Sequence, residues 1–219
     1  MSVGMVPPAL APAPTGFKLL GYNCAGVASA SVAVTTTAIN TTGANLLVAC
    51  ITNNDPTGTA VFTDSASNTW TALTRAAGSG HGASQIFYVF NPVTSATHTL
   101  TIGAVANSDA AVTFMAFSGS ASSPLTNQST SLTANPGSIT PANNGSLIVA
   151  VCNDDNSAGA SIAAVNTFPW SNVGQLTSVA GNRFAYGTSI FVQNTAATIN
   201  QSFSSGTFPS SAIAAFRSA

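Results

Sequence analysis

The chain has 219 residues, and only nine of them are Asp, Glu, Lys or Arg, with a formal net charge of −1. Charged residues make up 4% of the chain, against about 25% in ordinary globular domains. The four basic residues, Lys18, Arg75, Arg183 and Arg217, are too few to bind nucleic acid or to anchor the chain on an anionic membrane. The hydrophobic fraction of 45% excludes an intrinsically disordered chain, and no apolar run approaches the ~20 residues of a membrane helix.

The first 17 residues, MSVGMVPPALAPAPTGF, predict an extended arm. Proline fixes φ and removes a backbone donor, so this segment is not suited to a central strand. It lacks the charged start of a secretory signal, and we expect a protein made without a leader in a reducing cytoplasm. The arm either folds back on its own domain or, as we favour, binds a neighbouring subunit. The expected partner-binding residues are Met5, Val6, Pro7, Pro8, Leu10, Pro12 and Pro14.

After the arm, short β-branched and aromatic segments recur every ten to fifteen residues between Gly, Asn, Asp, Ser and Pro. This pattern is typical of all-β sandwiches, and helix-type spacing is nearly absent. We therefore predict an antiparallel two-sheet β-sandwich, jelly-roll-like in its arrangement. The segments that carry the prediction are SVAVTTT (31–37), NLLVACIT (45–52), TAVFT (59–63), TWTALTR (69–75), SQIFYVF (84–90), THTLTIG (97–103) and AAVTFMAF (110–117).

The second half of residues 18–219 repeats the first. NLLVACITNND (45–55) matches SLIVAVCNDDN (146–156), IFYVFN (86–91) resembles IFVQN (190–194), and AAVTFMAFSG (110–119) resembles SSAIAAFRSA (210–219). An internal duplication of about seven strands, with pseudo-repeats near 27–119 and 127–219, explains these matches. The fourteen strands would form one large sandwich, which we favour because it buries more surface, or two tandem sandwiches.

One charged residue stands out in the stretch FTDSASNTW (62–70), where Asp64 lies between two predicted strands. Asp and Asn side chains bind nearby backbone in turns, so we expect Asp64 and Asn68 to close a hairpin connection. A calcium loop needs several oxygen ligands at alternate positions, which this stretch lacks. The acidic stretch NDDN (153–156) is similarly predicted to cap a loop. We expect no bound metal and no other cofactor.

The sequence offers no set of catalytic residues. His81 falls in a predicted loop and His98 in a predicted strand, and the G-x-S-x-G motif of a nucleophilic serine is absent. Of the three cysteines, Cys50 and Cys152 lie in apolar runs and are expected to be buried free thiols. We therefore expect a protein that is not an enzyme.

The stretch TDSASNTW, followed by the strands IFYVF and THTLTI and a final AAF-type strand, resembles a β-sandwich module of secreted bacterial and phage-encoded surface proteins. The likeness covers residues 30–219. It implies a jelly-roll or lectin-like sandwich with a role on a virion or cell surface. The resemblance assigns no catalytic residue.

These features together predict a structural protein of a virus particle, most simply a bacteriophage capsid decoration protein or another virion surface component. Its partners would be copies of itself and a major capsid or other virion protein, after assembly in the host cytoplasm. The weak charge would let many copies pack closely. The alternative is a glycan-binding, lectin-like adhesion module on a phage tail or on the extracellular surface of a bacterium. In that case Trp70 or Trp170 would stack on a sugar.

Overall fold

The structure is a computed structural model that describes residues 16–27, 32–55, 61–103, 109–154, 163–164, 171–176, 185–193, 195–204 and 207–219. Within these ranges every regular element is a β-strand and the paired strands are antiparallel. No helix in this part of the chain has the length and hydrophobicity needed to cross a membrane. The antiparallel all-β fold expected from the sequence is confirmed.

The first half of the chain forms one large sheet and one small sheet. The large sheet has the order β1-β9-β3-β7-β5, with β6 also paired to β7, and the small sheet has the order β2-β8-β4. The strands are β1 (Lys18–Val27), β2 (Val34–Thr35), β3 (Leu46–Asn53), β4 (Phe62–Asp64), β5 (Thr71–Ala72), β6 (Ala76–Gly78), β7 (His81–Phe90), β8 (Leu100–Ile102) and β9 (Ala110–Ser118).

The second half repeats this plan. Its large sheet has the order β10-β18-β12-β15-β14, and two strand pairs, β11-β16 and β13-β17, replace the small sheet. The strands are β10 (Ser120–Ser131), β11 (Ser138–Ile139), β12 (Ser146–Asp154), β13 (Ala163–Ala164), β14 (Ser171–Leu176), β15 (Ala185–Gln193), β16 (Ile199–Asn200), β17 (Phe203–Ser204) and β18 (Pro209–Ser218).

The strand order confirms the internal duplication and extends it to the first strand of each half. β1 pairs with β9 as β10 pairs with β18, and both edge strands have a register shift at the same place. The shift follows Leu19, opposite Phe117, and it follows Leu125, opposite Phe216. β1 was not among the strands predicted from the sequence, because Gly21, Gly26 and polar residues interrupt its apolar pattern.

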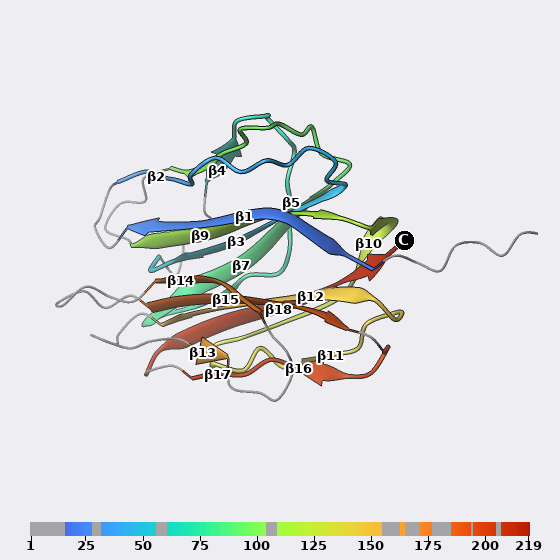
Figure 1. The fold of residues 1–219 in the computed structure, drawn as a ribbon. Helices are drawn as coiled ribbons and strands as arrows, with labels where there is room; N and C mark the ends of the chain where they lie inside the picture. Colours follow the sequence, from blue (N-terminus) through green and yellow to red (C-terminus); the bar gives the residue numbers. More distant parts are fainter. Residues whose placement is uncertain are drawn as a thin grey trace, which may run out of the picture.

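The sheets stack in four layers (Figure 1), with the two large sheets in the middle and the short strands outside. Equivalent faces of the two large sheets point towards each other. Leu46 and Val48 on β3 occupy the positions of Leu147 and Val149 on β12, and all four belong to one central core cluster. The remaining apolar residues form two outer cores, one beneath each small outer layer.

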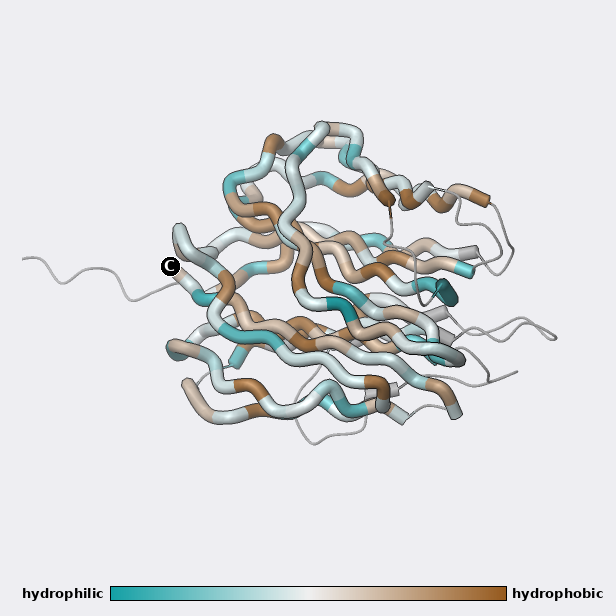
Figure 2. The backbone as a smooth tube through the Cα atoms, turned by 180° about the vertical axis from the view of Figure 1, so that it is seen from behind, coloured by the Kyte–Doolittle hydropathy of each residue, from teal (hydrophilic) through white to brown (hydrophobic). Residues whose placement is uncertain are grey.

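Because the large sheets are covered on both faces, their inner strands are continuous apolar runs. All described positions of β3 and β12 are buried, as expected for strands packed on two sides. Hydrophobic stretches accordingly run through the stacked strands in Figure 2. Leu46, Val48, Leu147 and Val149 face the interior at equivalent positions, and none of them has measurable exposure.

We expect Val48→Ala and Val149→Ala each to lower the free energy of unfolding by about 1–3 kcal/mol, because each removes buried methyl groups and leaves a cavity between the large sheets. Val93→Ala is the control, since Val93 is 63% exposed and its truncation should cost almost nothing. Urea unfolding of the three variants gives the comparison. Equal stability of Val48→Ala and the wild type would place Val48 outside the core.

Two expectations about how the strands are connected and aligned are wrong. The stretch FTDSASNTW is not a hairpin, because β4 before it pairs with β8 in the small sheet while β5 after it pairs with β7 in the large sheet. The match of IFYVFN with IFVQN is two residues out of register, because it aligns Ile86 with Ile190. In the structure Tyr88 is the equivalent of Ile190, since Tyr88 lies opposite Val48 and Ile190 lies opposite Val149. A slip of two residues keeps every side chain on its own face, so the apolar pattern alone does not reveal it.

Candidate functional site: an apolar opening between the large sheets

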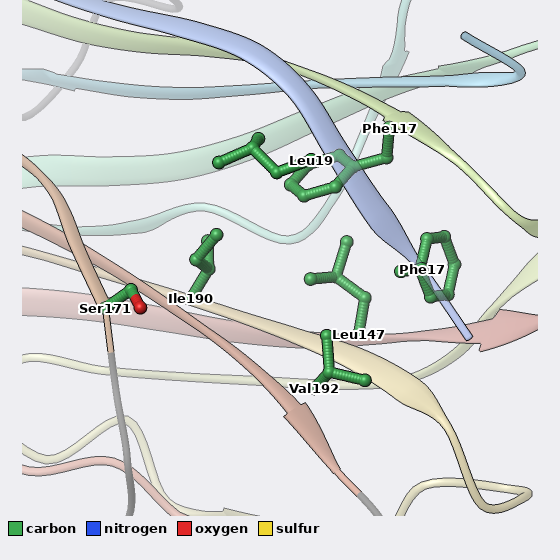
Figure 3. Close-up of a pocket in the computed structure, with 7 residues that line it drawn as sticks. All are labelled: Phe17, Leu19, Phe117, Leu147, Ser171, Ile190 and Val192. Atoms are coloured by element: carbon green, nitrogen blue, oxygen red, sulfur yellow. The ribbon is translucent and has the colours of Figure 1, made fainter.

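The central core has an opening to the surface between the two large sheets. A pocket of about 110 Å³ lies between the large sheets, where β1 and β9 approach β12, β14 and β15. Figure 3 shows that Leu19 and Phe117 reach into it from the first half, with Leu147, Ile190 and Val192 opposite. Its lining residues are Phe17, Leu19, Phe117, Leu147, Ser171, Ile190 and Val192.

The side chains that line the pocket are apolar apart from the Ser171 hydroxyl. Phe17 and Phe117 form an edge-to-face pair with ring centroids 6.2 Å apart. Leu19 and Val192 are half-buried and Ser171 is exposed, so the pocket communicates with solvent along β14. No described charged side chain lines it. A site of this kind can hold one small uncharged group, such as a branched aliphatic side chain, since apolar cavities only slightly larger bind benzene.

The internal duplication explains why the core is open on this side. At the positions equivalent to Ile190 and Val192 the first half has Tyr88 and Phe90. The Tyr88 ring packs edge-to-face on Phe216, with a centroid distance of 5.6 Å. Replacing these two aromatic residues by smaller aliphatic ones removes side-chain volume, and Phe17 fills only part of the space. The pocket therefore results from a difference in side-chain size between the two halves.

The described chain begins at the rim of this pocket. Gly16 precedes Phe17, and a Cβ built on Gly16 would lie 3.8 Å from Val192 Cγ1. Phe17, the last residue of the expected arm, is itself buried in the central core. The predicted partner-binding residues Met5, Val6, Pro7, Pro8, Leu10, Pro12 and Pro14 all precede Gly16 and lie outside the described residues.

Asp64 closes a turn, as predicted, and it also takes part in a buried network. Its carboxylate accepts hydrogen bonds from the backbone N–H groups of Ala66 at 2.8 Å and Asn68 at 3.2 Å, and from Trp70 Nε1 at 2.6 Å. His98 Nε2 lies 3.2 Å from Asp64 Oδ1. Burial raises the pKa of Asp64, but the hydrogen bonds from Trp70, Asn68, Ala66 and His98 outweigh it and hold the pKa below its ordinary value.

Thr41, His98 and Asp64 are arranged in the order of a hydroxyl, an imidazole and a carboxylate, yet they are placed for structure. Thr41 Oγ1 lies 3.0 Å from His98 Nδ1. The same hydroxyl donates a hydrogen bond to the carbonyl of Ser95 and accepts one from the backbone N–H of Ser95. Thr41 and His98 have no measurable exposure. A nucleophile must reach its substrate, and this hydroxyl is buried between the strand connections that it holds together.

Trp70 is unsuited to the sugar-stacking role proposed for it. Its ring packs edge-to-face on Phe62 and Phe114, with centroid distances of 5.4 and 6.2 Å, and its N–H is bound to Asp64. Trp70 is therefore half-buried in the outer core of the first half. Trp170 lies outside the described residues.

A second polar cluster lies inside the central core and could not be foreseen from the sequence. Tyr186 is fully buried and its hydroxyl contacts Thr113 Oγ1 and accepts a hydrogen bond from Thr188 Oγ1 at 2.6 Å. A Cβ on Gly174 would lie 2.1 Å from Thr113 Oγ1, so this position needs glycine. Burial, together with the nearby thiols of Cys24 and Cys50, raises the pKa of Tyr186, and the phenol stays neutral.

Other candidate residues from the sequence lie within strands in the part of the chain described. Cys50 and Cys152 are buried free thiols, as predicted, and burial raises the pKa of both well above the ordinary value. Asp154 is the last residue of β12, and its Oδ1 accepts a hydrogen bond from the backbone of Phe208 at 3.4 Å. His81 starts β7 instead of lying in a loop, and its Nδ1 is 3.0 Å from the carbonyl of Pro209.

Among described residues, no group of three His, Cys, Asp or Glu side chains is placed to hold a metal ion. The lining residues of the pocket were not among the candidates from the sequence. The only available signal was the replacement of Tyr88 and Phe90 by Ile190 and Val192, which the two-residue slip in the alignment of the halves concealed. Comparison of the chain with protein-family models, with characterised proteins and with solved structures finds no match.

Proposed function

We propose that this protein is a non-enzymatic structural component of a virus particle, namely a bacteriophage capsid decoration protein or another virion surface component. The observation that carries the proposal is the apolar pocket at the point where the proline-rich arm joins the body. A segment that loses little backbone entropy on docking, joined to a rigid body, is suited to linking subunits.

Further support comes from the body itself. Its described His98, Asp64, Thr41 and Tyr186 side chains stabilise buried contacts and are not presented to a substrate. A chain with so few charges meets little electrostatic repulsion when many copies pack together. The proposal includes a jelly-roll or lectin-like relationship, assembly in the host cytoplasm, and partners that are copies of this chain and a major capsid or other virion protein.

The test compares the full chain with a chain that lacks residues 1–15, which keeps Phe17 in the core. We expect both proteins to have nearly the same melting temperature, and the truncated one to be strongly depleted on purified particles. Cryo-electron microscopy and quantitative mass spectrometry of the particles give the occupancy. Absence of the full chain from purified particles would refute the proposal.

A glycan array with the same two proteins separates this function from the adhesion alternative. A decoration protein should show no saturable binding to any sugar. Saturable binding that is unaffected by removal of residues 1–15 would favour the glycan-binding module instead.

A further inference from the structure

We propose that the apolar pocket receives the side chain of Leu10 from the arm of a second copy of this chain. This inference rests on the proposed function and deepens it by naming the partner of the arm. Each chain carries both the arm and this pocket, so the same contact repeated from copy to copy can build a closed ring or a longer assembly.

The pocket has the size and chemistry for one branched aliphatic side chain. Its volume is about 110 Å³, and its walls are the rings of Phe17 and Phe117 and the side chains of four aliphatic residues. Proline-rich segments bind in grooves lined with aromatic rings. The hydroxyl of Ser171 at the open edge is a donor, and it matches an arm whose prolines contribute carbonyl acceptors without N–H donors.

The pocket also lies between two edge strands. β1 and β14 end the described paths of their large sheets, and the pocket opens between them (Figure 3). An edge strand presents backbone groups that are available to another chain. A segment that lies along this edge can therefore form backbone hydrogen bonds while it places one side chain in the pocket.

The sequence of the arm disfavours insertion of Leu10 into the pocket of its own chain. Phe17 already lines the pocket, and Gly16 lies on its rim. Leu10 is the first large aliphatic residue before Gly16, and Pro12 and Pro14 lie between them. Each proline fixes its own φ and disfavours a helical turn at the preceding residue. An extended segment of about 3.1 Å per residue spans about 19 Å over the six residues from Leu10 to Gly16, which is longer than a pocket of about 110 Å³.

The first experiment measures self-association of the full chain by sedimentation equilibrium. We expect Leu10→Ser to raise the dissociation constant about ten- to a hundredfold, because the complex loses the free energy gained by burying one leucine side chain. Val93→Ser is the matched control, because it removes an exposed apolar side chain from the body. Ile190→Tyr places in the pocket the residue that fills the equivalent position, Tyr88, and should abolish association while the melting temperature is kept or raised.

A disulfide trap tests the contact directly, without dependence on the folding of Ile190→Tyr. One tagged copy carries Leu10→Cys and a second, differently tagged copy carries Leu19→Cys, whose side chain lines the pocket. We expect mixed disulfide-linked dimers above the background from the native thiols. The control is Leu125→Cys, at the equivalent position on β10, which should give only background.

The outcomes separate this inference from the proposed function. A chain with both Leu10→Cys and Leu19→Cys that cross-links only within itself would show that the arm fills its own pocket and would overturn the inference. Equal trapping by Leu19→Cys and Leu125→Cys would also overturn it. If truncation of residues 1–15 removes the protein from particles but copies do not associate, the proposed function stands and this inference fails. If the trap succeeds but particles lack the protein, the inference stands and the proposed function fails.

Discussion

The two halves of the chain, produced separately as residues 16–119 and 120–219, are expected not to give stable folded monomers. Each half would expose the inner face of its large sheet, including Leu46 and Val48 in one fragment and Leu147 and Val149 in the other. Each such side chain gains about 1.5–3 kcal/mol from burial. Loss of the whole central core therefore exceeds the 5–15 kcal/mol by which a typical domain is stable.

Mixing the two fragments should restore the fold, since the contact between the halves consists of non-covalent packing of one sheet on the other. Light scattering coupled to size exclusion gives the mass, and thermal unfolding gives the cooperativity, for each fragment and for the mixture. Aggregation or loss of cooperative unfolding is expected for the separate halves, with recovery in the mixture. Two monomeric fragments that each unfold cooperatively would instead identify two tandem sandwiches that fold independently.

Removal of the Asp64 carboxylate is expected to be the most damaging single change to a charged residue in the described part of the chain. Asp64→Ala should lower the free energy of unfolding by about 2–4 kcal/mol, because several half-buried N–H groups lose their charged acceptor at once. Those groups belong to Trp70, Asn68 and Ala66. Asp109→Ala is the control, since the half-buried Asp109 carboxylate accepts a hydrogen bond from Asn54 Nδ2 at 3.2 Å and from no other side chain among the described residues.

The same carboxylate gives the stability a predictable dependence on pH. Because the pKa of Asp64 is held below its ordinary value in the folded protein, its contribution is complete above the pKa of about 3.9 in the unfolded chain and is lost as the pH falls through the folded pKa. The stability difference between the wild type and Asp64→Ala should therefore shrink as the pH is lowered from 6 towards 3. Urea unfolding at each pH measures it, and a difference that is constant over this range would contradict the assignment.

Sequence patterns predicted the parts of the fold that depend on local chemistry. The runs around Val48 and Val149 were predicted to be strands from their apolar and β-branched residues, and the turn at Asp64 followed from the preference of Asp for binding nearby backbone. The role of His98 was not predictable, because its contact with Asp64 joins residues 34 positions apart through a small sheet whose strands are only two or three residues long. β1 was missed for a similar reason, since its place depends on pairing with the distant β9.

The pocket was not predictable because it depends on differences in volume at equivalent positions. An alternating pattern shows which side chains point inwards but gives no information on how well opposite faces fit together. Ile190 and Val192 satisfy the pattern as well as Tyr88 and Phe90 do. Only the strand register, which places Ile190 opposite Val149 as Tyr88 lies opposite Val48, shows that one side of the core contains less side-chain volume.

The two equivalent sheets pack through the same face within one polypeptide, as two identical chains can do in a homodimer. In a homodimer of identical chains, every substitution appears twice and changes both sides of the interface at once. Covalent duplication removes this constraint, because a residue in one half can change while its counterpart is conserved. Tyr88 can thus keep one side of the interface closed while Ile190 opens the other. Fusion therefore allows a self-complementary contact to acquire a single asymmetric binding site without loss of the fold.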